Sequence, residues 1–255
     1  MKMKEEAMKN TMQEEDWTEE AMEDFQDYDP FAEETDGVSW DGCRDFWEAF
    51  REELGDSDAQ LQKIGTPSEE GEGFRMPEDL MTPGYTTNAF QGVILYHHAM
   101  NFLFDGEYTG EKRMPVCWSY DGKNGEGKPG RACKGCDKNR FSSGENGKGK
   151  ACRNKRRVYV LAEGRRLPEM ISIPTGSLGY FYRYVTYLVE RGLRPSQMVT
   201  RFTVVTGEKD GRRYPQILLT PMRQLNPEEE AIMAEMGALV KEYAREARVE
   251  EYEEE

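Results

Sequence analysis

The sequence of 255 residues lacks any long apolar run and contains only five cysteines. No window approaches the ~18 apolar residues of a membrane-spanning helix, and the first ten residues, MKMKEEAMKN, lack the apolar core of a secretion signal. These absences predict a cytoplasmic protein. In that reducing compartment, five cysteines argue against a disulfide framework and indicate either metal binding or buried thiols.

Catalytic patterns are missing as well. The chain has no glycine-rich nucleotide-binding loop, no helix with a His-Glu metal motif and no Ser-His-Asp set. Its two histidines, His97 and His98, lie in an apolar stretch, where a histidine is more often a core or surface residue than a ligand. The sequence therefore predicts a protein that is not an enzyme and that has neither a small-molecule substrate nor a membrane partner.

The charge of the chain is unevenly distributed. Residues 1–80 hold 7 Lys and Arg against 26 Asp and Glu, residues 81–225 hold 24 against 12, and residues 226–255 hold 3 against 11. The net charge of −15 thus describes the two ends and not the middle. Because charged residues make up 33% of the chain and apolar residues only 37%, part of it is expected to stay solvated. We expect a basic central domain between two acidic arms.

Residues 1–84 are predicted to form the first acidic arm, which is largely disordered. Over residues 1–38, acids surround isolated aromatics, a composition that cannot bury enough surface to order itself. Residues 41–54 predict a short amphipathic helix that either docks on the protein's own core or serves as a partner-binding motif. Residues 55–84 have the Gly, Pro, Ser and Glu content of a linker. The apolar face of the helix consists of Phe46, Trp47, Phe50 and Leu54.

Residues 85–225 are predicted to form the nucleic-acid-binding domain. Aromatic and β-branched residues indicate strands before and after the cysteine-rich segment, then a helix starting at Ser177 and ending at Gly192. A two-stranded hairpin around residues 207–211 follows. We expect a mainly β protein with flanking helices (α+β), and this order of elements suits an OB-fold-like five-stranded barrel. Residues 226–255 predict a C-terminal helix and an acidic tail.

Four of the five cysteines follow a C-x15-C-x2-C-x15-C spacing. In the central pair, Gly135 lets the backbone turn both thiolates onto one metal ion. The intervening loops are almost devoid of apolar side chains, so a bound metal gives them a physical reason to be ordered. The sequence predicts one structural Zn²⁺ in a zinc-ribbon insertion at residues 115–153, and leaves Cys43 as a free thiol. The predicted ligands are Cys117, Cys133, Cys136 and Cys152.

Cations and aromatic rings crowd around these cysteines and recur on the later hairpin. A cationic groove follows phosphates, and flat rings stack on unpaired bases at about 1–3 kcal/mol each. Double-stranded DNA keeps its bases in the stack, so the combination favours single strands. For any one ring, packing in the core is an equally open interpretation. The predicted DNA contacts are Trp118, Tyr120, Lys134, Lys138, Arg140, Phe141, Arg153, Lys155, Arg156, Arg157, Tyr159, Arg201, Arg212, Arg213 and Tyr214.

The cysteine-rich run, with PVCWSYDG and GRACKGCDKNRFSSGENGKGKAC, resembles the zinc-containing single-stranded-DNA-binding proteins of tailed bacteriophages, and the likeness extends through SIPTGSLGYFYRYV. The resemblance implies an OB domain that coats and protects unpaired DNA without sequence preference, in a bacterial host cell. It also implies an acidic tail that competes with DNA for the groove and recruits replication and recombination proteins. It places the groove cations at residues 153–157.

Two departures from that family limit the resemblance. The well-known phage helix-destabilising protein has a histidine in its zinc set and a basic N-terminus, whereas this chain has four cysteines and an acidic N-terminus. Cooperative polymerisation is therefore not implied. A second class stays open, a zinc-containing interaction protein such as a transcription adaptor or phage-encoded inhibitor whose acidic arms bind a basic partner. The cationic middle counts against a pure mimic of DNA.

Overall fold

The computed structural model describes residues 40–55, 60–78, 83–106, 114–144, 147–209 and 211–246. These residues form a mixed α/β fold, mostly strands with three α-helices, in which eight strands make one sheet and two make a small hairpin. The helices are α3 (Cys43–Leu54), α4 (Leu178–Val189) and α5 (Pro227–Glu246). The strands are β1 (Lys63–Ile64), β2 (Phe74–Met76), β3 (Tyr85–Thr87), β4 (Ala89–Leu103), β5 (Cys117–Ser119), β6 (Glu126–Gly127), β7 (Arg153–Ala162), β8 (Glu169–Ile173), β9 (Met198–Lys209) and β10 (Arg212–Gln224).

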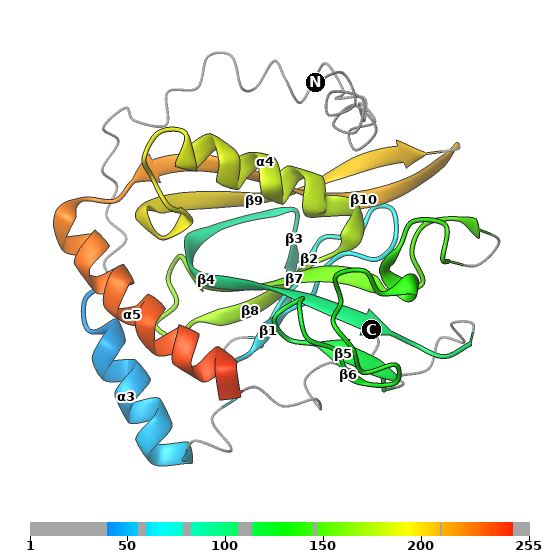
Figure 1. The fold of residues 1–255 in the computed structure, drawn as a ribbon. Coiled ribbons are helices and arrows are strands. Elements are labelled where there is room, and N and C mark those ends of the chain that lie inside the picture. The colour runs from blue at the N-terminus through cyan, green and yellow to red at the C-terminus, as the bar shows by residue number, and fades with distance from the viewer. Residues whose placement is uncertain are drawn as a thin grey trace, which may run out of the picture. The chain divides into compact units, whose positions relative to one another are not determined.

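Strand β4 organises the sheet (Figure 1). One edge of β4 pairs with β7, which is followed by β8 and β1. The other edge is shared, since β9 pairs with residues 89–93 of β4 and β5 pairs with residues 101–103. A register shift between Ile94 and Tyr96 leaves Leu95 as an extra residue on β4, which is the signature of a β-bulge. Thus β4 connects the β9–β10 hairpin to the cysteine-rich segment.

The two faces of the sheet bury separate apolar clusters. On one face, Val93, Leu95 and Tyr159 pack under α3 and α5, where the ring of Trp47 meets that of Tyr243 edge-on at 5.7 Å. A side chain at Gly237 of α5 would come within 3.0 Å of the Leu95 carbonyl oxygen, so a glycine lets α5 lie against the bulge.

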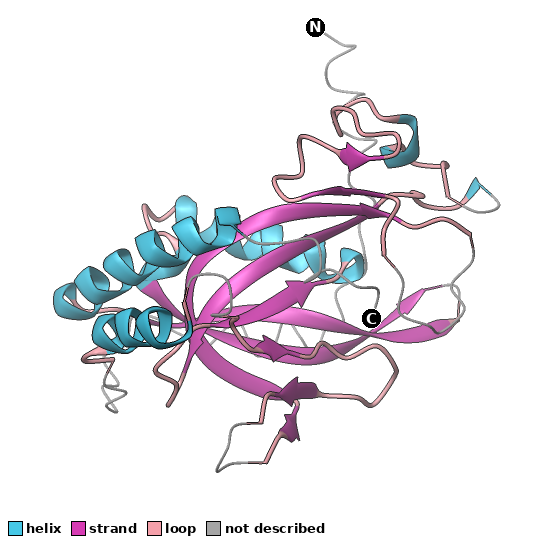
Figure 2. Cartoon of the chain, turned by 90° about the horizontal axis from the view of Figure 1, so that it is seen from below, coloured by secondary structure: helices cyan, strands magenta, loops and turns pink. Residues whose placement is uncertain are grey.

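The other face of the sheet packs against α4 and the β2–β3 hairpin. There Ile94 and Val158 belong to the same buried cluster as Phe181, which is 1% exposed. Figures 1 and 2 both place α3 and α5 at the end of the sheet opposite the loops around residues 120–150. We call the end with α3 and α5 the helix-covered end of the sheet, and the end with these loops the loop-covered end.

Local sequence signals define the helix ends. The Asn226 side chain accepts hydrogen bonds from the amides of Glu228 and Glu229, and the Glu229 carboxylate accepts one from the amide of Asn226. This reciprocal pair is a capping box at the start of α5. Gly192 follows α4 with a φ of 75°, as expected of a helix-ending glycine.

Helix α3 confirms the amphipathic helix predicted near residues 41–54. Its residues Cys43 and Trp47 are buried, so the interpretation that it docks on the protein's own core is confirmed. The predicted linker over residues 55–84 is wrong in its described part, because β1 and β2 lie there. Phe74 and Met76 point inward from β2. The predicted disorder of residues 1–38 concerns residues outside the described ranges.

The predicted order of strands, one helix and a hairpin is present, with α4 between β8 and β9. The predicted five-stranded barrel is not closed within the described residues, because β8 pairs with β1 and not with β10. The two residues of β1 occupy the edge that a closing strand would use. The OB fold and the zinc ribbon are therefore not confirmed. None of the described helices combines the length and the apolar content needed to span a lipid bilayer.

Candidate nucleic-acid interface

The segment between β4 and β7 carries the four spaced cysteines, and we call residues 114–152 the cysteine module; its residues 145–146 lie outside the described ranges. Strand β5 attaches the module to the end of β4. A second attachment runs through amides, since Asn154 Nδ2 donates to Asn101 Oδ1 at 2.5 Å and to Asn139 Oδ1 at 3.1 Å. Lys150 Nζ donates to Asn154 Oδ1 at 2.9 Å. These polar contacts add to a small apolar cluster, in which Trp118 and Tyr120 of the module pack against Met100 and Phe102 of β4.

The central cysteine pair forms the knuckle that the spacing predicts. Gly135 between the two cysteines has a φ of 82°, a left-handed conformation that favours glycine. Burial opposes ionisation of the Cys136 thiol, but hydrogen bonds from Arg131 and from the amides of Lys138 and Asn139 outweigh it, so the pKa of Cys136 lies below its ordinary value. Amides directed at a thiolate are the outer contacts expected of a metal-binding cysteine.

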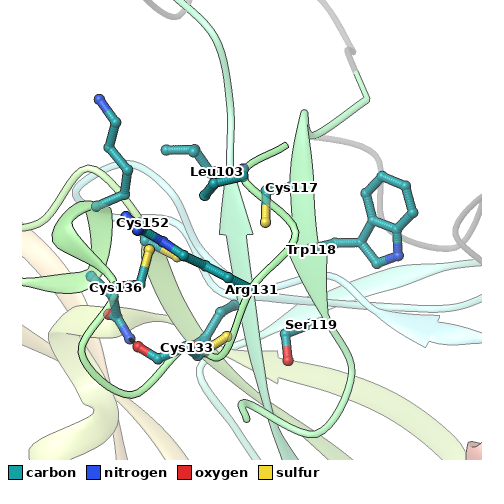
Figure 3. A pocket seen from close by; sticks show the side chains of 12 residues that line it. Leu103, Cys117, Trp118, Ser119, Arg131, Cys133, Cys136 and Cys152 are labelled. Carbon is teal, nitrogen blue, oxygen red and sulfur yellow. Dashed lines mark hydrogen bonds between the residues drawn. The ribbon is translucent and has the colours of Figure 1, made fainter. Parts of the chain in front are cut away.

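All four module cysteines line one cavity of about 20 Å³, together with Leu103, Trp118 and Arg131. Figure 3 shows their sulfur atoms around the same space, contributed by β5, by the knuckle and by the residue before β7. Burial, together with the other three thiols, raises the pKa of Cys152 to about 12. Four thiolates in one cavity require a cation to neutralise them.

The four thiols line the same cavity, but they are not arranged with the geometry of a metal site. Among the residues that the structure describes, no group of three or more His, Cys, Asp or Glu side chains is arranged to hold a metal ion. The number and chemistry of the donors nevertheless fit zinc, which four thiolates bind in structural sites. The cavity has room for one small ion. Its walls come from segments far apart in sequence, so a metal would bind them together.

Residues 114–157 hold 12 Lys and Arg against 4 Asp and Glu, and two of the acids are engaged within the module. Burial opposes ionisation of Asp121, but hydrogen bonds from Asn124, Lys123 and Ser119 lower its pKa to about 2. The carboxylate is therefore fixed as a turn-forming acceptor. Asp137 lies 3.0 Å from Arg131. The cations of this segment therefore outnumber its acids by three to one.

The predicted contacts on the module lie at its surface. Lys134, Lys138 and Arg140 are exposed, and the ring of Phe141 is 81% exposed, the largest exposed fraction among the exposed large apolar side chains described. Trp118 and Tyr120 are half-buried beside Met100 and Phe102. A flat ring left in water beside cations is the arrangement that stacks on an unpaired base.

Two predicted contacts prove to be interior residues. Tyr159 is 0% exposed and packs edge-on against Tyr243 of α5 at 6.3 Å, so its ring cannot stack on a base. Arg157 is 3% exposed, and its Nη1 lies 3.1 Å from the Met170 sulfur. Both side chains point to the face of the sheet that α5 covers. The sequence pattern alone could not show which face of β7 would be covered.

The remaining predicted contacts are spread over β7 and the β9–β10 hairpin. Arg153 lies over the ring of Phe104 at 5.3 Å, and Lys155 is half-buried. Arg213 pairs with Glu70 at 2.8 Å. Figure 1 shows the β9–β10 turn at the same end of the sheet as the cysteine module. Also on the hairpin are exposed Arg201 and Arg212 and half-buried Tyr214.

The predicted contact Arg156 belongs to a cluster whose other members, His97, Phe181 and Tyr182, sequence reasoning missed. The Nδ1 atom of His97 accepts from Arg156 Nε at 3.1 Å and lies 2.9 Å from its Nη2. The guanidinium carbon of Arg156 is 5.2 Å from the centroid of Phe181 and 6.0 Å from that of Tyr182. Tyr182 is 51% exposed. The pairing of β4 with β7 and the position of α4 bring these residues together. No local sequence pattern could therefore have predicted the cluster.

Comparisons with protein-family models, with curated proteins and with solved structures found no match to this chain.

Proposed function

We propose that the protein binds single-stranded DNA without sequence preference, through the cysteine module and the neighbouring turn of the β9–β10 hairpin. The observation that carries this proposal is Phe141, a ring 81% exposed next to Arg140 within a strongly cationic module. Cations alone would bind either form of DNA, whereas an exposed ring gains from bases that are unpaired.

The arrangement of strands supports the same proposal. In OB folds, the loops between strands 1 and 2 and between strands 4 and 5 contact oligonucleotides. If β4, β7, β8, β9 and β10 are taken in chain order as five such strands, those two loops are the cysteine module and the turn before Arg212. Both lie at the loop-covered end of the sheet (Figure 1). An OB-like architecture is thus part of the proposal.

One structural Zn²⁺ is also part of the proposal. Cys117, Cys133, Cys136 and Cys152 would hold it, and its charge would neutralise their thiolates and order the module. The phosphate-binding cations and Phe141 would then be presented from a rigid support. The resemblance further leads us to propose that the acidic tail recruits replication and recombination proteins.

The test compares Phe141→Ala with Phe46→Ala, a matched exposed phenylalanine, 49% exposed, on acidic α3. Affinities are measured by fluorescence anisotropy for oligo-dT, for a duplex and for a poly-anion at two salt concentrations. Phe141→Ala should weaken oligo-dT binding by about 1–3 kcal/mol and leave the salt dependence unchanged, and Phe46→Ala should have no effect. Equal affinity for duplex and single strands, or no binding beyond the poly-anion level, would refute the proposal.

A second candidate function is favoured by a different surface. On α3, Phe46 and Leu54 are 49% and 50% exposed. Together with Phe50 they follow one another at intervals of four residues and so lie along one side of the helix. Exposed acids lie around them: Asp45, Glu48 and Glu52. An apolar stripe with acidic borders suits a basic amphipathic helix of a partner protein. This candidate predicts that a Lys- and Leu-rich helical peptide binds the protein and that Phe46→Ala weakens it; unchanged binding would rule out this surface.

A further inference from the structure

Arg156 is a cation whose recorded interactions are all with neutral groups. Its partners are the His97 ring, through two guanidinium nitrogens, and the rings of Phe181 and Tyr182. By contrast, Arg131 pairs with Asp137 and Arg213 with Glu70. Within the described part of the chain, no carboxylate lies within ion-pair distance of Arg156. Its charge is fixed in place but not neutralised.

The local geometry also fixes the orientation of the Arg156 guanidinium. Because both Nε and Nη2 approach His97 Nδ1, this nitrogen accepts and the ring carries its proton on Nε2. Burial, reinforced by the charge of Arg156, lowers the pKa of His97 to about 4, so the ring stays a neutral acceptor near pH 7. The far edge of the guanidinium, with Nη1, is directed away from His97. A planar fork held in this way is suited to a phosphate.

The cluster lies next to the cysteine module on the sheet. Arg156 and Asn154 are two residues apart on β7, so their side chains share one face. Asn154 is the residue that docks the module through Asn101 and Asn139, and its carbonyl accepts from Thr175 Oγ1 just before α4 at 2.6 Å. Arg156 therefore stands between the module and the first turns of α4.

We propose that Arg156 and Tyr182 form a nucleotide subsite, in which Arg156 binds a backbone phosphate, Tyr182 stacks on the adjacent base, and His97 is the positioning residue for Arg156. The subsite rests on the proposed function and extends it, because it carries a single strand from the cysteine module onto α4. Tyr182 supplies the exposed ring, 51% accessible, while Phe181 beneath the guanidinium is 1% exposed and supports it from below.

The experiment uses the full-length protein, labelled oligo-dT and a series of salt concentrations. Arg156→Gln should weaken binding and reduce the slope of log affinity against log salt by about 0.7, the value for one lost phosphate contact on a single strand. Tyr182→Leu should weaken binding by about 5- to 150-fold with an unchanged slope. The matched control is Arg191→Gln, which removes a cation that lies over Tyr187 at the other end of α4 and should leave both quantities unchanged.

The role of His97 is tested by rescue. His97→Leu removes the acceptor and should reduce the salt slope as Arg156→Gln does, whereas His97→Gln restores an acceptor and should recover part of it. Arg156→Lys keeps the charge and serves as a second variant if Arg156→Gln does not fold. If the folded Arg156 and Tyr182 variants bind oligo-dT with the affinity and salt slope of the wild-type protein, the proposed subsite is wrong but the proposed function is not. Failure of the wild-type protein to bind oligo-dT would overturn the proposed function and the subsite with it.

Discussion

At the scale of single residues, Glu169 on β8 is a carboxyl group in the protein interior. It is 2% exposed, and Arg165 Nε lies 3.2 Å from its Oε1. Neither carboxylate oxygen accepts a hydrogen bond within the described structure. Burial raises the pKa of Glu169 to about 7, although the charge of Arg165 opposes this shift.

This shift predicts a pH-dependent stability. The native state holds the Glu169 proton more tightly than the unfolded state, whose pKa is near 4.5. The stability is therefore fully present below pH 4.5 and is lost as pH rises through 7. Glu169→Gln should flatten the dependence in that window and raise stability at pH 8 by up to about 3 kcal/mol. Denaturant unfolding at several pH values checks it, with exposed Glu163→Gln as control; an unaltered pH profile in Glu169→Gln contradicts it.

Residues also show where sequence reasoning reaches its limit. Phe141 and Tyr159 carry the same signal, a ring among cations, yet one is 81% exposed and the other 0%. The difference depends on α5, which covers Tyr159 through Tyr243, and that contact joins residues far apart in the chain. Ser177 likewise has the pattern of a helix cap, but its Oγ accepts from the amide of Ile217.

At the scale of elements, strong local patterns were sufficient for prediction. The helices α3, α4 and α5 and the strands β7 to β10 are confirmed, because periodicity, caps and turns lie within each segment. The short strands β1, β2 and β3 were missed, since each has two or three residues and depends on partners elsewhere. β1, for instance, pairs Lys63 with Met170 of β8, 107 residues later.

The cysteine module allows a prediction about metal removal. Its loops lack an apolar core, so we expect one Zn²⁺ per chain and loss of the module's order when a chelator removes the ion. Cys133→Ser should abolish zinc binding. Cys43→Ala should retain it, because Cys43 is a buried residue at the start of α3, outside the module. Metal analysis and thermal unfolding with and without chelator provide the measurements. A folded wild-type protein with far less than one zinc, and no change with chelator, would falsify the expectation.

At the scale of the whole molecule, the charge is divided between two ends of the sheet. The exposed residues of α3 and α5 are predominantly acidic, whereas the cysteine module at the other end is cationic. The sequence predicted the division along the chain, a basic middle between two acidic arms, because counting charges requires no knowledge of the fold. It did not predict the open sheet, because closure depends on whether β8 meets β10 or β1, a choice between distant segments.

The acidic tail at residues 250–255, which lies outside the described ranges, yields the corresponding prediction. If it visits the cationic module, its deletion should tighten DNA binding at low salt, and the gain should shrink as the Debye length falls below ~10 Å. A variant with the tail glutamates changed to glutamine should behave like the deletion. Equal affinities of all three proteins in low salt would mean that the tail acts on partners only.

The bulge in β4 determines where this protein can tolerate a change in chain length. Because Leu95 is the extra residue, removal of one residue at 94–96 would convert the bulge into regular pairing and leave the other side chains of β4 on their present faces. Removal of one residue elsewhere in β4 would turn the side chains on one side of the deletion to the opposite face of the sheet. Insertions and deletions that preserve function should therefore concentrate at the bulge, within the space that Gly237 leaves for it.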